Sequence, residues 1–213
     1  MHNFPAINDR PVRLGVLISG GGSTLLNFLD CIRDGSLNAE VPLVIASQAD
    51  CRGVQRARDA GLECVPIVRR DFASLADFSD AVFERLKAAE VDLVTMAGYL
   101  SLLRIPDEFL GRVLNIHPSL IPAFCGKGMF GDRVHKAVVA RGVKVSGCTV
   151  HFADNEYDHG PVILQRSIDL PEAVSADEVG RLVFEQEKIA YPEAIRRVAS
   201  GRLKIDERRT IYS

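Results

Sequence analysis

The sequence predicts an α/β fold: a Rossmann-like, mostly parallel, twisted sheet with helices on both faces and an antiparallel strand pair near the C-terminal half. Short runs rich in β-branched residues alternate with amphipathic stretches, which is the pattern of βαβ units. The early runs are apolar almost throughout, as strands covered on both faces must be. Two longer runs later in the chain flank an acidic loop, as the strands of an antiparallel pair do.

The individual elements follow from these runs in order. We expect strands at residues 12–19, 41–47, 64–68, 91–97 and 113–116, and the antiparallel pair at residues 145–153 and 162–168. Between the early strands we expect helices at residues 24–33, 52–60 and 74–89. The first half of the chain is therefore predicted to be doubly wound.

A long helix is predicted to close the fold. Ser175 and Glu178 fit a capping box, in which Ser175 is the N-cap. The buried stripe that follows consists of Val179, Leu182, Val183 and Ala190. At about 100° per residue, Gln186 falls inside this stripe and Glu187 on its edge. From this segment alone, two locally satisfied side chains are favoured over a substrate contact.

The composition is that of one soluble domain, with 47% hydrophobic and 25% charged residues among 213. We expect a single domain over residues 1–213, with a loose arm at residues 1–11 and a tail at residues 204–213. The net charge of -2 provides no field for a nucleic acid or an anionic membrane. No apolar stretch approaches the roughly 18 residues of a membrane span, and the N-terminus does not resemble a signal peptide.

Cysteine and histidine usage argues against disulfides and metals. The five cysteines are odd in number, widely spaced and never form C-x-x-C, which favours a reducing cytoplasm over a disulfide framework or a zinc site. No two histidines have the spacing of metal ligands, so we expect no metal. His2, His135, His151 and His159 are each assigned a structural role.

A glycine-rich loop, Ser-Gly-Gly-Gly-Ser-Thr at residues 19–24, follows the first strand and opens the first helix. Backbone N–H groups there converge on one point and the helix dipole favours negative charge, which predicts a phosphate cradle. The loop is neither a Walker A motif nor G-x-G-x-x-G, because Leu25 holds the third glycine position. A simple tight turn is the alternative, but each extra glycine costs about 0.5 to 1 kcal/mol.

Asn115 and His117 lie at the carboxyl end of the fifth predicted strand, the edge where open α/β sheets bind ligands. Alternation along the strand puts both side chains on the same side, which suits stabilisation of an oxyanion. The acidic loop at residues 154–160 adds a carboxylate only if it folds back over this edge. Without further information, a solvated turn is the favoured interpretation of that loop. A nearby carboxylate raises the pKa of a histidine.

Five segments together resemble the folate-dependent formyltransferase family, and within it the branch that acts on glycinamide ribonucleotide. They are LISGGGSTLL, AGYLSLL, LNIHPSLIP, GCTVHFADNEYDHGPVI and EQEKIAYP, and they are collinear over roughly residues 12–203. The NIHPSLIP segment is shared by the wider family. The glycine loop and the Q-E-x-x-x-Y-P helix indicate the glycinamide ribonucleotide branch.

The resemblance implies transfer of the formyl group of 10-formyltetrahydrofolate, the co-substrate, to the amine of glycinamide ribonucleotide. It implies a catalytic trio of Asn115, His117 and Asp158, with Asp158 raising the pKa of a protonated His117. The residues implied to bind glycinamide ribonucleotide are Gly21, Gly22, Ser23, Thr24, Leu25 and Glu187. Those implied to bind the folate are Leu100, Ser101, Leu102, Leu103, Asn115, Asp154, Asn155, Glu156, Tyr157 and Asp158. The partners are then these small molecules, and the chain acts as a monomer or a homodimer.

The sequence departs from the family pattern in several places. Thr24 stands where asparagine is usual, and Leu75 and Ser101 stand where many relatives have arginine. Arg69 and Arg70 are candidates to bind the carboxylates of the folate glutamate in place of those arginines. Paired arginines after a strand, however, more often lie at a solvent-exposed edge. Residues 124–134 form a longer stretch than in some relatives and are a candidate mobile lid. The resemblance also implies a cis bond before Pro122.

Four alternatives have different requirements. A 10-formyltetrahydrofolate hydrolase uses the same trio on water and needs no amine pocket, so Glu187 and the glycine loop count against it. A formyltransferase acting on another amine keeps all of these features. A methionyl-tRNA formyltransferase needs a basic RNA-binding surface, which the charge balance does not favour. A non-catalytic nucleotide or folate sensor has no need of the trio.

Overall fold

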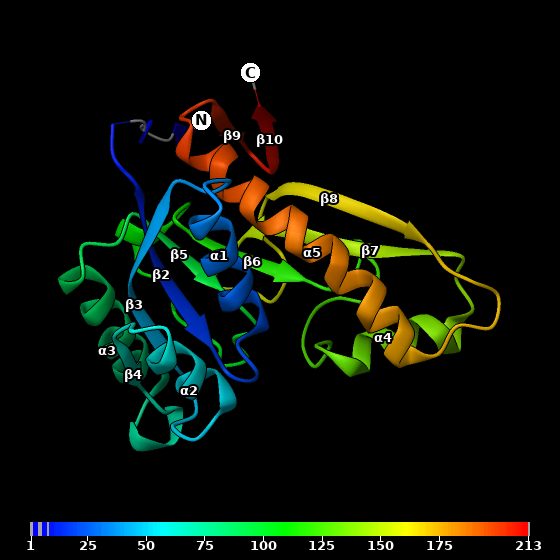
Figure 1. The fold of residues 1–213 in the computed structure, drawn as a ribbon, viewed down its shortest axis with the longest axis horizontal. Coiled ribbons are helices and arrows are strands. Elements are labelled where there is room, and N and C mark those ends of the chain that lie inside the picture. Colours follow the sequence, from blue (N-terminus) through cyan, green and yellow to red (C-terminus); the bar gives the residue numbers. More distant parts are fainter. Residues whose placement is uncertain (1, 4–5, 8, 213) are drawn as a thin grey trace. The chain divides into compact units, whose positions relative to one another are not determined.

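A computed structural model of the protein describes residues 2–3, 6–7 and 9–212 (Figure 1). The chain forms two compact units. The first unit is Ala6–Leu114, and the second combines Met1–Pro5 with Asn115–Ser213. Strand β6 (Val113–His117) begins in the first unit and ends in the second.

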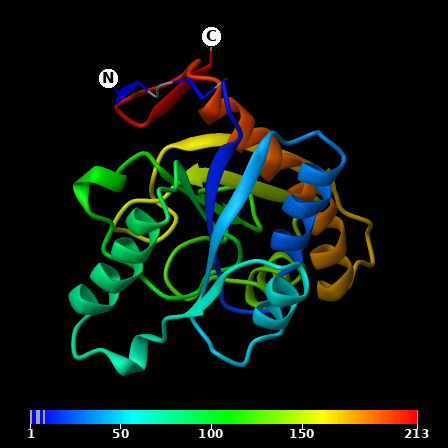
Figure 2. The same cartoon turned by 60° about the vertical axis from the view of Figure 1, so that its left-hand side comes forward.

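The first unit contains a parallel sheet with the strand order β4-β3-β2-β5. Its strands are β2 (Val12–Ile18), β3 (Ala39–Ala46), β4 (Cys64–Pro66) and β5 (Leu93–Met96). Its helices are α1 (Ser23–Arg33), α2 (Arg52–Asp59) and α3 (Leu75–Ala88), with short 3-10 turns η1 (Arg69–Asp71) and η2 (Asp107–Phe109). Figure 2 shows α1 and α3 on opposite sides of the strands, so this half is doubly wound as predicted.

The α3 helix packs directly on β2. Phe78, Val82 and Leu86 recur every four residues along one face of α3, and all three are fully buried. Burial of each such side chain contributes roughly 1.5–3 kcal/mol. The approach is so close that a Cβ added at Gly15 of β2 would lie 2.4 Å from the Cδ2 atom of Leu86. Glycine at this position lets the helix cover the strand.

The second unit is built around the antiparallel pair β7 (Val145–Phe152) and β8 (Val162–Asp169), whose register runs from Val145 opposite Asp169 to His151 opposite Val162. Helix α5 (Ala176–Ala199) packs on both strands and on α4 (Asp132–Arg141). The Ser175 side chain accepts the backbone N–H of Glu178 at 3.2 Å, which confirms its N-cap role. Val179, Val183 and Ala190 are buried and Leu182 is half-buried, so the predicted stripe is the packed face.

The second unit also contains a small antiparallel sheet with the order β1-β9-β10. Its strands are β1 (His2–Asn3), β9 (Leu203–Asp206) and β10 (Arg209–Tyr212). The expected loose arm therefore contains a strand, and the expected tail contains most of a hairpin. Of those two segments, residues 1, 4, 5, 8 and 213 lie outside the described residues.

The fold class is confirmed, because the parallel strands of the first unit and the antiparallel pair β7–β8 occur where they were expected. Helix α4 was not predicted, and its first three residues fall within the candidate lid at residues 124–134. Only Val134, His135 and Val138 of α4 are buried, which leaves too narrow an apolar stripe for periodicity to stand out. The single domain and the mobile lid stay predictions.

Candidate functional site

The three residues of the predicted catalytic trio come together within the second unit. Strand β6 presents Asn115 and His117, and Asp158 lies in the loop between β7 and β8. The Asp158 Oδ2 atom lies 3.5 Å from Nδ1 of His117, and its Oδ1 atom accepts a hydrogen bond from Nδ2 of Asn115 at 3.4 Å. The side chains of His117 and Asp158 are only 4% and 9% exposed. The carboxylate is thus buried against the strand, and a wholly solvated turn is the wrong interpretation of this loop.

A fourth residue, His151 on β7, joins the trio although sequence reasoning gave it a structural role. Its Nδ1 atom is 2.8 Å from the Phe152 carbonyl oxygen, which can only accept, so Nδ1 carries the proton in the neutral ring. The remaining nitrogen, Nε2, then accepts from the Asn115 amide at 3.2 Å. His151 therefore orients the amide that the trio uses. Its place one residue from the end of β7, beside the acidic loop, was the available signal.

Asp158 is held in an unusual backbone conformation. Its φ of 53° lies in the left-handed region, where residues other than glycine are uncommon. Its Oδ2 atom accepts the N–H of Gly126 at 2.8 Å. Burial by itself raises the pKa of Asp158, but the Gly126 N–H and, when they are protonated, the imidazoles of His151 and His117 lower the pKa below its usual value. The carboxyl group is therefore ionised at neutral pH.

His117 differs from the expectation that it is protonated. Burial lowers its pKa below 6.5, while Asp158 and the Phe124 carbonyl raise it by smaller amounts. Asp158 thus acts on the pKa in the expected direction, but burial outweighs it, and the resting imidazole is neutral at pH 7. The Nε2 atom lies 2.8 Å from the Phe124 carbonyl oxygen and donates to it, which leaves Nδ1 unprotonated beside Asp158. A proton arriving at Nδ1 would have the carboxylate as its acceptor.

The loop after β6 fixes the Phe124 carbonyl. The peptide bond between Ile121 and Pro122 is cis, as the resemblance implied. Thr149 of β7 accepts the N–H of Ile121 at 3.0 Å and donates to the Ser119 carbonyl at 2.7 Å. The Ser119 hydroxyl in turn donates to the carbonyl of Ala123 at 2.6 Å. These bonds tie the loop to β7, so that the acceptor for His117 is held in place.

Two neighbouring residues of α5 have different environments. Gln186 accepts from Nε of Arg166 at 2.9 Å, so its side chain is satisfied locally, as the segment alone suggested. Burial alone raises the pKa of Glu187 to about 7, and burial with the nearby Glu187 raises that of Cys148 to about 12. A carboxyl group held half-buried at this cost is unusual for a purely structural position.

The glycine loop of the first unit is formed by close backbone contacts. Gly22 has a φ of 73°, and a Cβ added to it would lie 2.9 Å from the Cα atom of Gly53, so this position requires glycine. Gly20 has open space around it. In the described part of the chain, no side chain caps the N-terminus of α1. Sequence reasoning missed Arg56 of α2, whose Nη1 donates to the Gly21 carbonyl at 2.7 Å and lies 3.5 Å from the Ser23 hydroxyl.

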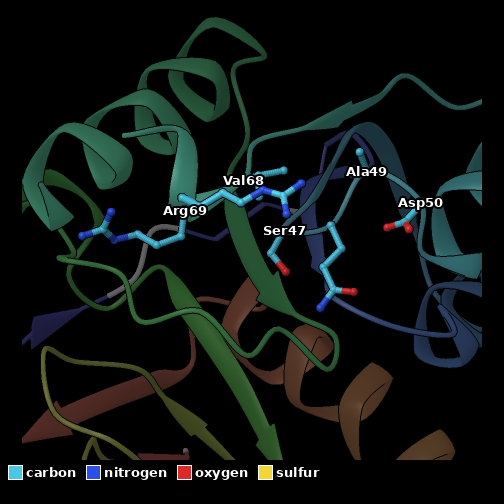
Figure 3. A pocket seen from close by; sticks show the side chains of 7 residues that line it. Ser47, Ala49, Asp50, Val68 and Arg69 are labelled. Atoms are coloured by element: carbon cyan, nitrogen blue, oxygen red, sulfur yellow. The ribbon is translucent and has the colours of Figure 1, made fainter. Parts of the chain in front are cut away.

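A pocket of about 420 Å³ opens in the first unit where β3 and β4 end (Figure 3). It is lined by Ser47, Gln48, Ala49, Asp50, Val68, Arg69 and Arg70. The Ser47 hydroxyl is 2.6 Å from that of Ser19, which accepts the N–H of Leu100 at 2.9 Å. The pocket is thereby connected to the start of the segment expected to bind folate. Along that segment, Leu100 is exposed, Ser101 and Leu102 are half-buried and Leu103 is buried.

The structure divides the expected substrate-binding residues between the units. Gly21 to Leu25 and Leu100 to Leu103 belong to the first unit, and Glu187 and the loop at residues 154–158 belong to the second. In that loop Asn155, Glu156 and Tyr157 are exposed. Among the described residues, no group of three or more His, Cys, Asp or Glu side chains is arranged to hold a metal ion. No helix in the same part of the chain is long and apolar enough to cross a membrane.

Comparison with known proteins gives a consistent result. The sequence model of the family described as formyl transferase matches residues 12–195. The chain is 36% identical to the chloroplastic phosphoribosylglycinamide formyltransferase of Arabidopsis thaliana over 199 residues, which are 92% of this chain and 68% of the relative. It is 32% identical to phosphoribosylglycinamide formyltransferase of Haemophilus influenzae over 197 residues, 92% of this chain and 91% of that protein.

A solved structure gives the same picture of the fold. Glycinamide ribonucleotide transformylase 1 from Symbiobacterium toebii superposes on this chain with a TM-score of 0.89 and is 42% identical to it. The superposition covers 96% of this chain and 95% of the other. The similarity therefore extends over nearly the whole of both chains.

Proposed function

Because the chain belongs to the formyl transferase family, we propose that it transfers the formyl group of 10-formyltetrahydrofolate to the amine of glycinamide ribonucleotide, a step of purine biosynthesis. The observation that carries the proposal is the buried group of Asn115, His117 and Asp158, which is complete within the second unit. Its ionised carboxylate, amide donor and neutral imidazole are the groups that acyl transfer to an amine requires.

In the reaction the amine nitrogen attacks the formyl carbon, and a tetrahedral intermediate with a negatively charged oxygen forms. An N–H of Asn115 donates to that oxygen, replacing its long contact of 3.4 Å with Asp158. The attacking nitrogen loses one proton, which the Asp158 carboxylate accepts. The bond between the formyl carbon and the folate nitrogen then breaks, and this nitrogen takes up the same proton, which the enzyme returns to it.

His117 assists by holding a proton during this exchange. Its Nδ1 atom faces Asp158 at 3.5 Å and its Nε2–H is fixed by the Phe124 carbonyl. When Asp158 passes the proton taken from the amine to Nδ1, the ring becomes an imidazolium with an acceptor at each nitrogen. The charged ring then stabilises the oxyanion beside Asn115, which reconciles a neutral resting histidine with the protonated form that the resemblance implies.

The substrate contacts are part of the same proposal. The phosphate of glycinamide ribonucleotide binds Gly21, Gly22, Ser23, Thr24 and Leu25, whose N–H groups surround the start of α1. Its amine end is oriented by Glu187. The folate ring binds along Leu100, Ser101, Leu102 and Leu103 and against Asp154, Asn155, Glu156, Tyr157 and Asp158.

The pocket with Arg69 and Arg70 is proposed to receive the carboxylates of the folate glutamate. Two guanidinium groups suit carboxylates because each can donate two parallel hydrogen bonds. Support comes from the connection through Ser47 and Ser19 to the backbone of Leu100. The enzyme is further proposed to work in the cytoplasm, without a metal or a nucleic acid, as a monomer or a homodimer.

The test is formyl transfer from 10-formyltetrahydrofolate, followed by absorbance with and without glycinamide ribonucleotide. Turnover that requires the nucleotide supports the proposal. Deformylation without the nucleotide indicates the hydrolase, and turnover only with a different amine indicates another acceptor. Binding of both substrates without turnover indicates a sensor and contradicts the proposal. Full activity in a His117→Ala variant contradicts the mechanism but not the reaction.

A further inference from the structure

The turn between β9 and β10 is bonded to the loop that carries Asp158. Arg208, in this turn, donates from Nη2 to the carbonyl oxygen of His159 at 2.7 Å. Its Nη1 atom lies 2.7 Å from Nε2 of the same histidine. Thr210 of β10 donates its hydroxyl to the carbonyl of Val162 at 2.6 Å, where β8 begins. The C-terminal hairpin therefore holds the loop that carries Asp158 at two places, near the point where the loop leads into β8.

The contact between Arg208 and His159 continues through the loop as a series of hydrogen bonds in which each donor and acceptor can be assigned. A guanidinium can only donate, so Nε2 of His159 accepts and Nδ1 carries the proton. That proton is donated to Oδ2 of Asp154 at 2.8 Å, while Oδ1 of Asp154 accepts the N–H of Glu156 at 2.9 Å. The chain of bonds runs from Arg208 through His159 and Asp154 to the backbone at Glu156. It includes residues on both sides of Asp158.

The backbone enclosed by these bonds needs such support. Asp158 has a φ of 53°, and conformations of this kind cost about 1 to 3 kcal/mol and persist only where the surroundings enforce them. At the end of the loop, a Cβ added to Gly160 would lie 1.9 Å from the Phe152 carbonyl oxygen, so the chain passes very close to itself there. Restraints outside Asp158 are therefore required to keep its carboxylate against His117 and Asn115.

We propose that Arg208 is a positioning residue for the transfer reaction, acting through His159 and Asp154 to hold the loop in which Asp158 meets His117. The inference rests on the proposed function for its catalytic consequence. Arg208 does not touch the trio. Its side chain lies in the C-terminal hairpin, a part of the chain in which we predicted only a tail.

The experiment compares Arg208→Ala with Arg209→Ala, which removes the same charge from the next, exposed side chain. Steady-state kinetics are measured with glycinamide ribonucleotide varied at saturating 10-formyltetrahydrofolate. In Arg208→Ala we expect kcat to fall about tenfold, because a small displacement of a catalytic group costs between one and two orders of magnitude. KM for the nucleotide should stay within about twofold, since the glycine loop is unchanged. Arg208→Lys, which keeps one donor, should recover part of kcat, and Arg209→Ala should resemble the original protein.

A second measurement separates this inference from the proposed function. Hydrogen exchange at residues 154–160 is followed in the same three variants, and faster exchange is expected in Arg208→Ala alone. If the unaltered protein has no transferase activity but exchange changes as expected, the function is wrong and the linkage stands. Unchanged kcat in Arg208→Ala, or equal effects of the two alanine variants, overturns the inference. So does a fall in kcat that is accompanied by loss of the folded state at the assay temperature.

Discussion

Two loops of this molecule take part in the proposed reaction, one through its backbone and the other through a side chain. The glycine loop at the start of α1 offers backbone N–H groups, and its shape depends on Gly22, which has a positive φ and close contact with Gly53. The loop between β7 and β8 offers a side chain, Asp158, and its shape depends on partners far away in the sequence, among them His117 and Arg208. The glycine loop is recognisable from its own residues, although Gly53 and Arg56 pack against it, whereas the loop with Asp158 acts only where the fold brings distant side chains together.

The largest effect is expected at the side-chain site. Asn115→Ala removes the amide donor to the oxyanion, so kcat should fall by about 10²–10³, or roughly 3–4 kcal/mol. Among the residues that the structure describes, the Nδ2 atom of Asn115 bonds to His151 and Asp158, so few contacts are lost and the folded state should remain intact. Steady-state kinetics of formyl transfer measure kcat, and thermal unfolding checks that the variant is folded. Asn38→Ala, at an exposed asparagine in the first unit, is the control. A variant with normal kcat would show that the oxyanion does not form beside Asn115.

The same contrast explains how much the sequence could predict. Periodicity did not place β1, α4, β9 or β10, but it placed the other helices and strands, because strands covered on two faces and amphipathic helices have strong local signals. It also put Asn115 and His117 on one face of β6. The contact of these two side chains with Asp158 was expected only from the family resemblance. The residues of the loop at 154–160 alone favoured a solvated acidic turn.

Three residues of the site escaped sequence reasoning for one physical reason. His151, Arg56 and Arg208 act through hydrogen bonds to groups in other elements, and apart from the place of His151 beside the acidic loop, nothing in their immediate neighbours indicates those bonds. The neutral state of the His117 imidazole could not be predicted from the sequence for a similar reason. A carboxylate partner is suggested by the sequence motif, but the burial that lowers the pKa of the imidazole is a property of the packed unit.

The second prediction concerns Glu187, whose ionised carboxylate is destabilised by burial. Its folded pKa of about 7 lies above its unfolded value, so it stabilises the fold only when protonated, and this contribution is lost as pH rises from about 4.5 through 7. Glu187→Gln removes the charge with little change in shape. At pH 8 the variant should be about 3 kcal/mol more stable, while KM for glycinamide ribonucleotide rises. At pH 4.5 the difference in stability should vanish.

Urea unfolding at the two pH values measures the Glu187 effect. Glu185→Gln is the matched control, because it removes an exposed carboxylate two residues away on the same helix. Equal stability of Glu187→Gln and the original protein at pH 8 would mean that the carboxyl group is not desolvated. An unchanged KM would remove Glu187 from the proposed amine site. The two readouts are independent, so the stability cost and the substrate role can fail separately.

The third prediction tests whether the glycine loop depends on the backbone of one residue. Gly22→Ala forces a Cβ into contact with Gly53 and imposes a side chain on a left-handed backbone, so stability should fall by about 1–2 kcal/mol. KM for glycinamide ribonucleotide should rise because the N–H groups no longer converge. Gly20→Ala is the control, since nothing lies within 4 Å of its added Cβ. Similar losses in both variants, measured by urea unfolding and kinetics, would mean that glycine content matters in this loop and the conformation of Gly22 does not.

The smallest effect is expected for Arg56, a cationic side chain that is bonded to the glycine loop. Its Nη1 atom donates to the Gly21 carbonyl, which fixes the loop, and the guanidinium adds positive charge beside Ser23 at the proposed phosphate position. Arg56→Ala should raise KM for glycinamide ribonucleotide about fivefold, or roughly 1 kcal/mol, with kcat nearly unchanged, because the contact stabilises bound substrate and transition state alike. Arg58→Ala removes an exposed arginine from the same helix and should leave KM unchanged. Because a phosphate contact is screened by salt, the difference between the two variants should shrink as ionic strength rises. If kcat falls instead, Arg56 acts on the reacting atoms, and the division between a binding loop made of backbone and a catalytic loop made of side chains is wrong.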